Sequence, residues 1–244
     1  MQLDTESLER LVPDQLEDAD VTGQATLGLH VQRYEFAATH VRSGRVLDIA
    51  CGVGFGSRIL RNAGGSGASV LGVDIDPAAV AYARQRYGDG GIDFRASDAM
   101  QFEDPEGFDL IVSLETVEHV PDPAGLLAHL MSLLRPGGVL VASVPTTPSV
   151  DLNPHHLHDF TAASFRALLR AQGAVELDQL AQIQPVDIWA LLRRRERRMG
   201  DLRRNLPSYY LAHPGSLLRR IWAIVTCGFA NHYLTIASQG PPRA

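Results

Sequence analysis

The chain has 244 residues, of which 45% are hydrophobic and 20% are charged, so it can bury one sizeable core and is not a disordered protein. Its two cysteines, Cys51 and Cys227, exclude a disulfide framework and fit a reducing compartment. The first twenty positions hold seven acidic residues and one arginine, which argues against a secretory signal. No apolar run reaches the roughly 18 residues of a membrane span, so we expect a cytoplasmic protein.

Charge is distributed unevenly along the chain. The formal net charge is −6, but residues 186–220 hold nine arginines and three acidic residues, so this segment carries +6 and the remainder −12. A single basic patch on an acidic body argues against a nucleic-acid partner. All 22 basic residues are arginine, which together with the high alanine content is typical of a GC-rich bacterial genome.

The predicted elements begin with a helix over residues 25–41, which follows an acidic N-terminal arm at 1–24. Short apolar runs then alternate with helical patterns along the rest of the chain. Strands are expected at 45–50, 70–74, 92–95, 108–114, 139–144, 174–180 and 232–238. Further helices are expected at 57–63, from 77 onward, at 123–134 and at 161–172.

Two of these helices have a strong start signal. Asp76-Pro77 and Asp122-Pro123 each place a capping carboxylate before a proline at the first helical position. The alternation of strands and helices predicts an α/β fold with a parallel sheet that is covered on both faces. We expect one domain over residues 25–244, with a helical insertion at 186–226 before the last strand.

The segment VLDIACGVGFGS (46–57) leads from a buried strand through three glycines into a helix. Glycine lets a ligand approach the backbone, and the first N–H groups of the helix point into the same crevice. Asp74 ends the next strand, where a carboxylate can accept hydrogen bonds from a ribose diol. Two other interpretations stay open: a tight turn with a capping acid, and a dinucleotide oxidoreductase. The second requires G-x-G-x-x-G, whose third glycine is Ser57 here.

Five motifs in the same order resemble those of class I S-adenosylmethionine-dependent methyltransferases. They are the glycine loop, Asp74, SDAMQF (97–102), FDLIVSLETVEHV (108–120) and LLRPGGVLVASVP (133–145). The resemblance covers about residues 28–180, resumes at the last strand, and implies a Rossmann-like, doubly wound sheet of seven strands. The chain departs from the family at Ala50, where glycine is usual. One added methyl group does not threaten the assignment.

The resemblance also implies a site for S-adenosylmethionine. Backbone groups of Ala50, Cys51 and Gly52 would face its methionyl part, in a crevice built by Asp48 to Gly54. Asp74 would hold the ribose hydroxyls. The adenine and the methionyl ammonium would be bound by Ile75, Asp98, the N–H of Ala99 and the carbonyl of Leu114.

Arg33, on the first predicted helix, is the candidate for the methionyl carboxylate. A guanidinium can bind a carboxylate through two parallel hydrogen bonds. The alternative interpretation of Arg33 is a solvated surface arginine.

A second group of polar residues follows the fourth predicted strand. Glu115, Glu118 and His119 are spaced E-x-x-E-H, and NPHHLHDFTAASF (153–165) lies downstream. This combination resembles the ubiquinone-biosynthesis O-methyltransferases and the small-RNA 2′-O-methyltransferases, with His156 in the place of the second histidine. In the neighbouring positions, His155 and His158 are expected to contact the acceptor or solvent.

The second resemblance implies that Glu115, Glu118, His119 and His156 bind one divalent ion, Mg²⁺ or another such as Mn²⁺, Fe²⁺ or Zn²⁺. Such an ion lowers the pKa of an acceptor hydroxyl by Lewis-acid coordination. In the alternative interpretation these residues line the cofactor pocket without a metal, and His119 or His156 accepts the proton as a general base.

We therefore predict an S-adenosylmethionine-dependent O-methyltransferase for a sugar or a small hydroxylated natural product, with His119 and His156 as catalytic residues. The alternatives are N-methylation of a small amine, RNA 2′-O-methylation, and a cofactor-binding scaffold without turnover. The insertion is predicted to be a lid over the acceptor, with Arg193, Arg194 and Arg195 favouring an anionic group. A solvated helix and docking at a membrane surface are the alternatives for the insertion. The oligomeric state is not predicted by the sequence.

Overall fold

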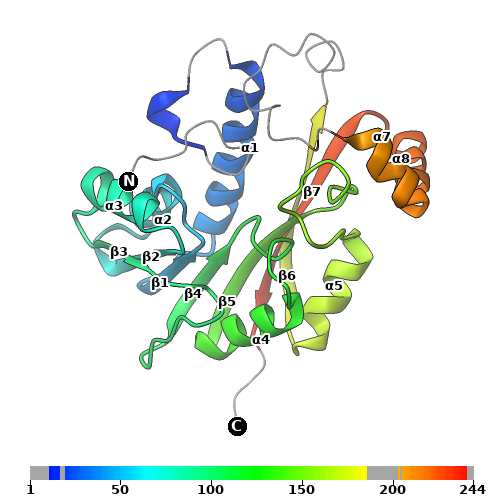
Figure 1. The fold of residues 1–244 in the computed structure, drawn as a ribbon. Coiled ribbons are helices and arrows are strands. Elements are labelled where there is room, and N and C mark those ends of the chain that lie inside the picture. The colour runs from blue at the N-terminus through cyan, green and yellow to red at the C-terminus, as the bar shows by residue number, and fades with distance from the viewer. Residues whose placement is uncertain (1–10, 17–19, 186–202, 204, 241–244) are drawn as a thin grey trace.

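The computed structural model describes residues 11–16, 20–185, 203 and 205–240. The predicted sheet is confirmed: seven strands lie in the order β3-β2-β1-β4-β5-β7-β6 (Figure 1). Their bounds are β1 Gly44–Ile49, β2 Ala68–Asp74, β3 Ile92–Ala96, β4 Phe108–Ser113, β5 Leu134–Pro145, β6 Val175–Pro185 and β7 Ala230–Gln239. Because the chain adds β2 and β3 on one side of β1 and β4 on the other, the strand order reverses between β1 and β4.

The prediction of an all-parallel sheet is wrong for one strand. β7 pairs antiparallel with both β5 and β6, while β1 pairs parallel with β2 and β4. Pro185 at the end of β6 lies opposite Ala230 at the start of β7, so these two strands form a long hairpin. The insertion stands at the tip of that hairpin. Without a crossover between the strands, β7 runs back along β6.

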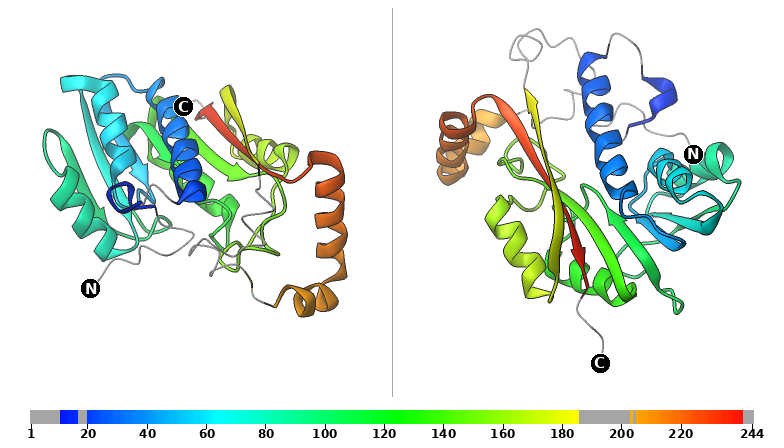
Figure 2. Two further views of the ribbon diagram at one scale, coloured as in Figure 1. Left: turned by 90° about the horizontal axis from the view of Figure 1, so that it is seen from above. Right: turned by 180° about the vertical axis from the view of Figure 1, so that it is seen from behind.

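Helices cover both faces of the sheet (Figures 1 and 2). Leu126, Leu130 and Phe165 belong to one core cluster, whereas Ala37 and Leu60 belong to a second. The first cluster joins α4 and α5 to one face of the sheet, and the second joins α1, α2 and α3 to the other. The helix bounds are α1 Val21–Ala38, α2 Phe55–Gly64, α3 Pro77–Tyr87, α4 Pro123–Leu133 and α5 Ala162–Ala171. This is the doubly wound arrangement that the sequence predicts.

The boundary between the acidic arm and the domain lies earlier than predicted. α1 begins at Val21, because the Asp20 carboxylate caps it by accepting a hydrogen bond from the Gly23 N–H at 2.7 Å. Leu11 and Val12, within the predicted arm, are buried beside a short 3-10 helix, Pro13–Gln15. Residues 1–10 and 17–19 of the arm lie outside the described residues.

Two helices, α7 (Leu206–Ala212) and α8 (Pro214–Cys227), form the described part of the insertion. They stand at the side of the sheet beyond β6 and β7 (Figure 2). α8 buries Ala223 and exposes apolar side chains such as Leu218, Trp222 and Val225. Arg193, Arg194 and Arg195 lie outside the described residues, so the structure does not test their predicted role. No helix among the described residues is long and apolar enough to cross a membrane.

Candidate functional site

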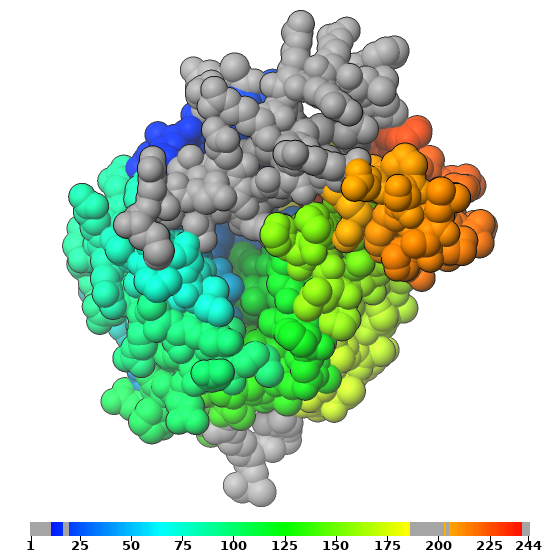
Figure 3. Space-filling model, viewed as in Figure 1, coloured from blue at the N-terminus to red at the C-terminus, as the bar shows by residue number. Residues whose placement is uncertain are grey.

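A cavity of about 1000 Å³ opens at the carboxyl ends of β1, β2, β4 and β5. Its position is the one that open α/β sheets use for ligands, beside the reversal of strand order between β1 and β4. In the space-filling view, a hollow lies between the cyan surface of the first half of the chain and the yellow-green surface after β5 (Figure 3). Residues of both predicted groups line this one cavity: Gly52 and Asp74 of the first, and Glu118 and His156 of the second.

The glycine loop after β1 presents open backbone to the cavity. Gly52 has φ +54°, a left-handed conformation that favours glycine, and a Cβ built there meets no atom within 4 Å. A ligand can therefore approach the loop backbone closely at Gly52, as the methionyl part of a nucleotide-like cofactor requires. Ala50 also has positive φ, +59°, which explains why glycine is usual at that position.

Asp74 joins the loops that follow β1 and β2. Its Oδ2 accepts a hydrogen bond from the Gly52 N–H at 2.8 Å, and its Oδ1 accepts one from the Asp76 N–H at 2.9 Å. The side chain lines the cavity. Each carboxylate oxygen has a second lone pair, so the side chain can accept from a ribose diol as well as fix the two loops.

Two of the predicted cofactor residues do not line the cavity, and this corrects the sequence analysis. Asp48 is buried, and its carboxylate accepts hydrogen bonds from the Tyr34 hydroxyl at 3.1 Å and the Ser57 hydroxyl at 2.6 Å. A Cβ at Gly54 would lie 2.7 Å from the ring of Phe94. Both residues pack against the protein interior and not against the cavity.

Burial has a marked effect on Asp48. It raises the pKa of this carboxyl group from 3.8 to about 7, and the two hydroxyl donors oppose that rise only in part. Near neutral pH, this carboxyl group is therefore protonated in a sizeable fraction of the molecules, whereas an ordinary aspartate is fully charged.

The remaining predicted cofactor residues do line the cavity. Cys51 and Leu114 are buried at its wall, while Ile75 is 69% exposed at its mouth. Asp98 lies in the turn after β3, where its carboxylate accepts from the Met100 N–H at 2.8 Å, and Ala99 lies beside it. An apolar side chain and a carboxylate at this end can bind the flat face and the amino edge of an adenine.

Arg33 is only 1% exposed, so the interpretation as a solvated surface arginine is wrong. Its side chain lines the cavity from α1, and its Nε donates to Gln182 Oε1 at 2.8 Å. Its NH1 atom lies 3.7 Å from Glu115 Oε1, and its guanidinium carbon lies 4.3 Å from the centre of the Tyr233 ring. A buried guanidinium in a cavity is well suited to an anionic group of a ligand.

Glu118, His119 and His156 come together on the other side of the cavity. Their ligand atoms lie within 4.8 Å of one another, and Glu118 is fully buried. The His119 and His156 rings meet edge to face with centres 4.6 Å apart. One carboxylate and two imidazoles form a donor set that suits a divalent metal ion, so the residues present fit such an ion.

Neighbouring groups orient both imidazoles. His119 Nδ1 lies 3.2 Å from the carbonyl oxygen of His155, and His156 Nδ1 lies 2.7 Å from Ser149 Oγ. Donation from Nδ1 to the carbonyl places the His119 lone pair on Nε2, the atom that lies 4.0 Å from Glu118 Oε1. Such outer partners are the usual means of fixing a histidine as a metal ligand.

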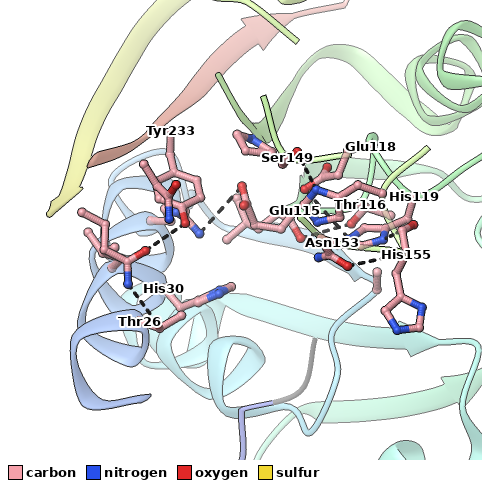
Figure 4. Close-up of a pocket in the computed structure, with 18 of the residues that line it drawn as sticks. Thr26, His30, Glu115, Thr116, Glu118, His119, Ser149, Asn153, His155 and Tyr233 are labelled. Carbon is pink, nitrogen blue, oxygen red and sulfur yellow. Dashed lines mark hydrogen bonds and ion pairs between the residues drawn. The ribbon is translucent and has the colours of Figure 1, made fainter. Parts of the chain in front are cut away.

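Glu115 lies outside this group, although the sequence analysis assigned it to the metal site. Its Oε1 accepts from the Ser143 hydroxyl at 2.7 Å, and its own N–H donates to that hydroxyl oxygen at 2.9 Å. Figure 4 shows Glu115 between Glu118 and His119 on one side and Tyr233 on the other. Its φ of +50° marks a strained backbone at the centre of the cavity.

Sequence reasoning missed the residues that hold α7 and α8 beside the cluster of Glu118, His119 and His156. Asp151 is buried in the loop that carries His156, and it accepts hydrogen bonds from Tyr210 at 2.6 Å and from Arg220 at 2.5 and 2.9 Å. These contacts hold α7 and α8 against that loop. No local motif marks them, because the three residues come from separate segments. The cavity-lining residues that the sequence analysis did not name include Thr26, His30, Thr147, Asn153, Gln184, Ala223, Ile224 and Tyr233.

Two nearby histidines differ in position. The exposed His155 lines the cavity, whereas His158 Nε2 lies 3.0 Å from the Val120 carbonyl oxygen. His158 is therefore engaged with the backbone after β4 and is not among the residues that line the cavity.

Comparison with known proteins agrees with this geometry. Residues 47–142, from β1 to β5, match the model of a family described as a methyltransferase domain. A probable S-adenosylmethionine-dependent methyltransferase of Mycolicibacterium smegmatis is 32% identical over 170 residues, which cover 63% of this chain and 64% of that protein. A ubiquinone biosynthesis O-methyltransferase of Stutzerimonas stutzeri is 35% identical over 133 residues, 48% of this chain and 56% of that protein.

Over the matched residues, the chain is thus similar to S-adenosylmethionine-dependent methyltransferases. The resemblance stated from the motifs is thereby confirmed. Among solved structures, the N-methyltransferase NodS of Bradyrhizobium japonicum, in complex with S-adenosyl-L-homocysteine, superposes with a TM-score of 0.60. It is 18% identical, and the match covers 89% of this chain and 88% of NodS, which shows a common fold. The chain spans somewhat less than two thirds of the two curated relatives described above.

Proposed function

We propose that the chain is an S-adenosylmethionine-dependent O-methyltransferase that acts on a sugar or a small hydroxylated natural product. One observation carries the proposal: a single cavity joins the open backbone at Gly52 and the Asp74 carboxylate to the cluster of Glu118, His119 and His156. The first pair is suited to a nucleoside with an amino-acid tail. The second group is suited to an acceptor hydroxyl whose proton must be removed.

The chain's own residues would hold the cofactor as follows. Asp74 accepts the ribose hydroxyls, the backbone at Gly52 lies against the methionyl part, and Arg33 binds its carboxylate. Asp98 and Ile75 bind the adenine at the mouth of the cavity. Bound S-adenosylmethionine supplies a methyl group on a positively charged sulfur. The protein must then align the acceptor oxygen with this methyl group and remove the proton of the acceptor hydroxyl.

We also propose that Glu118, His119 and His156 bind a divalent ion, Mg²⁺ or another such as Mn²⁺. Such an ion would lower the pKa of an acceptor hydroxyl. The bond between His119 Nδ1 and the His155 carbonyl, together with Ser149 beside His156, keeps the two imidazoles in place for this role. Glu115, which is bound to Ser143, is left out of the proposed ligand set.

The cluster of Glu118, His119 and His156 favours O-methylation over N-methylation. An amine that has lost its proton is already a nucleophile, whereas a hydroxyl group must be activated. Glu118 and the two imidazoles stand where an acceptor would enter beside the cofactor half of the cavity.

The experiment is a turnover assay with defined probes. The purified chain is incubated with S-adenosylmethionine and, separately, with catechol, a monosaccharide and a primary aliphatic amine, and release of S-adenosylhomocysteine is measured. Each reaction is run after dialysis against a chelator, with and without added Mg²⁺ or Mn²⁺. We expect turnover of a hydroxylated probe that depends on added metal. Methylation of the amine alone, or full activity of the metal-free chain, would contradict the proposal.

A further inference from the structure

Arg33 and Gln182 form a buried contact between segments that are far apart in the sequence. Arg33 lies on α1 and is 1% exposed, whereas Gln182 lies on β6 and is 6% exposed. The Arg33 Nε–H donates to Gln182 Oε1 at 2.8 Å. This bond occupies one N–H group of the guanidinium. Because the guanidinium is a rigid plane, the bond also fixes the directions of its other N–H groups.

The amide of Gln182 has a defined orientation. Its Nε2 donates to the Leu29 carbonyl oxygen at 3.2 Å and to Gln32 Oε1 at 2.8 Å, while its Oε1 accepts from Arg33. A flipped amide would place its NH₂ group against the guanidinium and its oxygen against two acceptors. Three contacts to α1 therefore fix the side chain in one position, and its oxygen is available to Arg33.

Tyr233 and Glu115 also contact the Arg33 guanidinium. The Tyr233 ring lies 4.3 Å from the guanidinium carbon, and Tyr233 is held in turn by its hydroxyl bond to Gln184 Oε1 at 2.9 Å. On another side, Glu115 Oε1 lies 3.7 Å from Arg33 NH1, too far for a hydrogen bond. Glu115 is thus an ion-pair partner that can draw the guanidinium toward itself when the Gln182 hydrogen bond is removed.

We propose that Gln182 is a positioning residue for cofactor binding: it keeps the Arg33 guanidinium from closing on Glu115, with which it forms only a long ion pair of 3.7 Å, and directs its remaining N–H groups toward the carboxylate of S-adenosylmethionine. The inference rests on the proposed function, since it assigns Arg33 to the methionyl carboxylate. A long arginine side chain loses rotamer freedom when it binds a ligand, and prior fixation removes part of that cost. Gln182 itself contacts Arg33 and α1 and is not among the residues that line the cavity.

The test compares two ligands that differ in the amino-acid group. S-adenosylhomocysteine has the carboxylate, whereas 5′-methylthioadenosine keeps the adenosine and lacks it. Gln182→Met preserves the length of the side chain and removes its hydrogen bonds. By calorimetry we expect S-adenosylhomocysteine to bind roughly 5- to 30-fold more weakly to this variant, with less than a twofold change for methylthioadenosine.

Two further variants separate positioning from a general defect. Gln179→Met, at an exposed β6 residue bonded to Arg166 of α5, should change neither affinity. Arg33→Met should show the same selective loss as Gln182→Met, and adding Gln182→Met to Arg33→Met should weaken binding no further, because the two residues act as one unit.

The outcomes divide clearly. Equal weakening of both ligands by Gln182→Met, or additive effects in the double variant, would overturn the positioning role and leave the proposed function intact. A wild-type chain that binds neither ligand would instead contradict the proposed function, and this inference with it.

Discussion

The two halves of the cavity are built in different ways. The half proposed to bind the cofactor, the cofactor half, consists of turns at the ends of adjacent parallel strands, where backbone N–H groups and one carboxylate, Asp74, set the geometry. The half proposed to bind the acceptor, the acceptor half, is assembled from side chains of separate segments, such as the pair formed by Asp151 and Arg220 and the contact between the His119 and His156 rings. The fold itself therefore fixes the first half. Individual side chains fix the second, which is the half that substitutions can alter without changing the sheet.

Removal of a proposed metal ligand should give the largest effect and separate the halves most clearly. We expect His156→Ala to lower turnover at least ~100-fold, the scale of losing a catalytic proton acceptor or its equivalent. The affinity for S-adenosylhomocysteine should stay within twofold, because His156 lies in the acceptor half. Mn²⁺ binding, followed by electron paramagnetic resonance, should be lost as well. His213→Ala, at an exposed histidine outside the cavity, is the matched control. Retained Mn²⁺ binding in His156→Ala would reject the ligand set.

Asp74→Ala should produce the reverse pattern. Loss of hydrogen bonds to a charged group costs about 1.5–3 kcal/mol, so we expect S-adenosylmethionine to bind roughly 10- to 150-fold more weakly. Turnover at saturating cofactor should change much less. Asp93→Asn, at an exposed carboxylate on β3, serves as the control. If Asp74→Ala bound the cofactor as tightly as the wild type, Asp74 would not contact the ribose.

The supporting carboxylate behind the glycine loop predicts a dependence of stability on pH. The pKa of Asp48 is raised to about 7 in the folded chain, whereas an unfolded aspartate has about 3.8. Between these values the folded state holds the extra proton, so the free energy of unfolding falls as pH rises from about 4 to about 7. From pH 5 to 7.5 we expect this group to contribute a loss of about 2 kcal/mol.

Denaturant unfolding of the wild type and of Asp48→Asn at pH 5 and at pH 7.5 measures this contribution. The variant should lose less stability than the wild type across that interval. Equal losses in the two proteins would mean that Asp48 is already charged in the fold.

The smallest effect is expected where α7 contacts the loop between β5 and α5, which carries Asp151 and His156. Tyr210→Phe removes one hydrogen bond to the buried Asp151, which keeps its contacts to Arg220. We expect a loss of about 1.5 kcal/mol in the free energy of unfolding and a raised KM for the acceptor. Affinity for S-adenosylhomocysteine should not change. A weaker cofactor affinity in this variant would show that the two halves are coupled.

The sequence predicts the cofactor half well because its determinants are local. A strand, a glycine turn, a helix start and a strand-end carboxylate follow each other in one strand–helix–strand unit, from β1 to the end of β2, and Gly52 and Asp74 lie where these motifs place them. Asp48 and Gly54 belong to the same motif, but their side-chain positions face the interior. Which face of the loop they occupy depends on Tyr34 and Phe94, which come from other elements.

The rest required tertiary contacts that no local pattern encodes. β6 was predicted to end at residue 180, because Gln182 and Gln184 interrupt the apolar pattern of the strand. In the structure it continues to Pro185, and both glutamines form hydrogen bonds to α1. Glu115 was grouped with Glu118 and His119 because of the E-x-x-E-H spacing and the resemblance that this motif carries. Ser143 on the adjacent strand draws its carboxylate away from them.

The most direct test of the account is a calorimetric titration of the wild-type chain with S-adenosylmethionine and, separately, with NADH. Both ligands contain an adenosine, and the glycine loop with Asp74 resembles a binding site for either. The account predicts saturable binding of one S-adenosylmethionine per chain and no binding of NADH. Binding of NADH without binding of S-adenosylmethionine would contradict it.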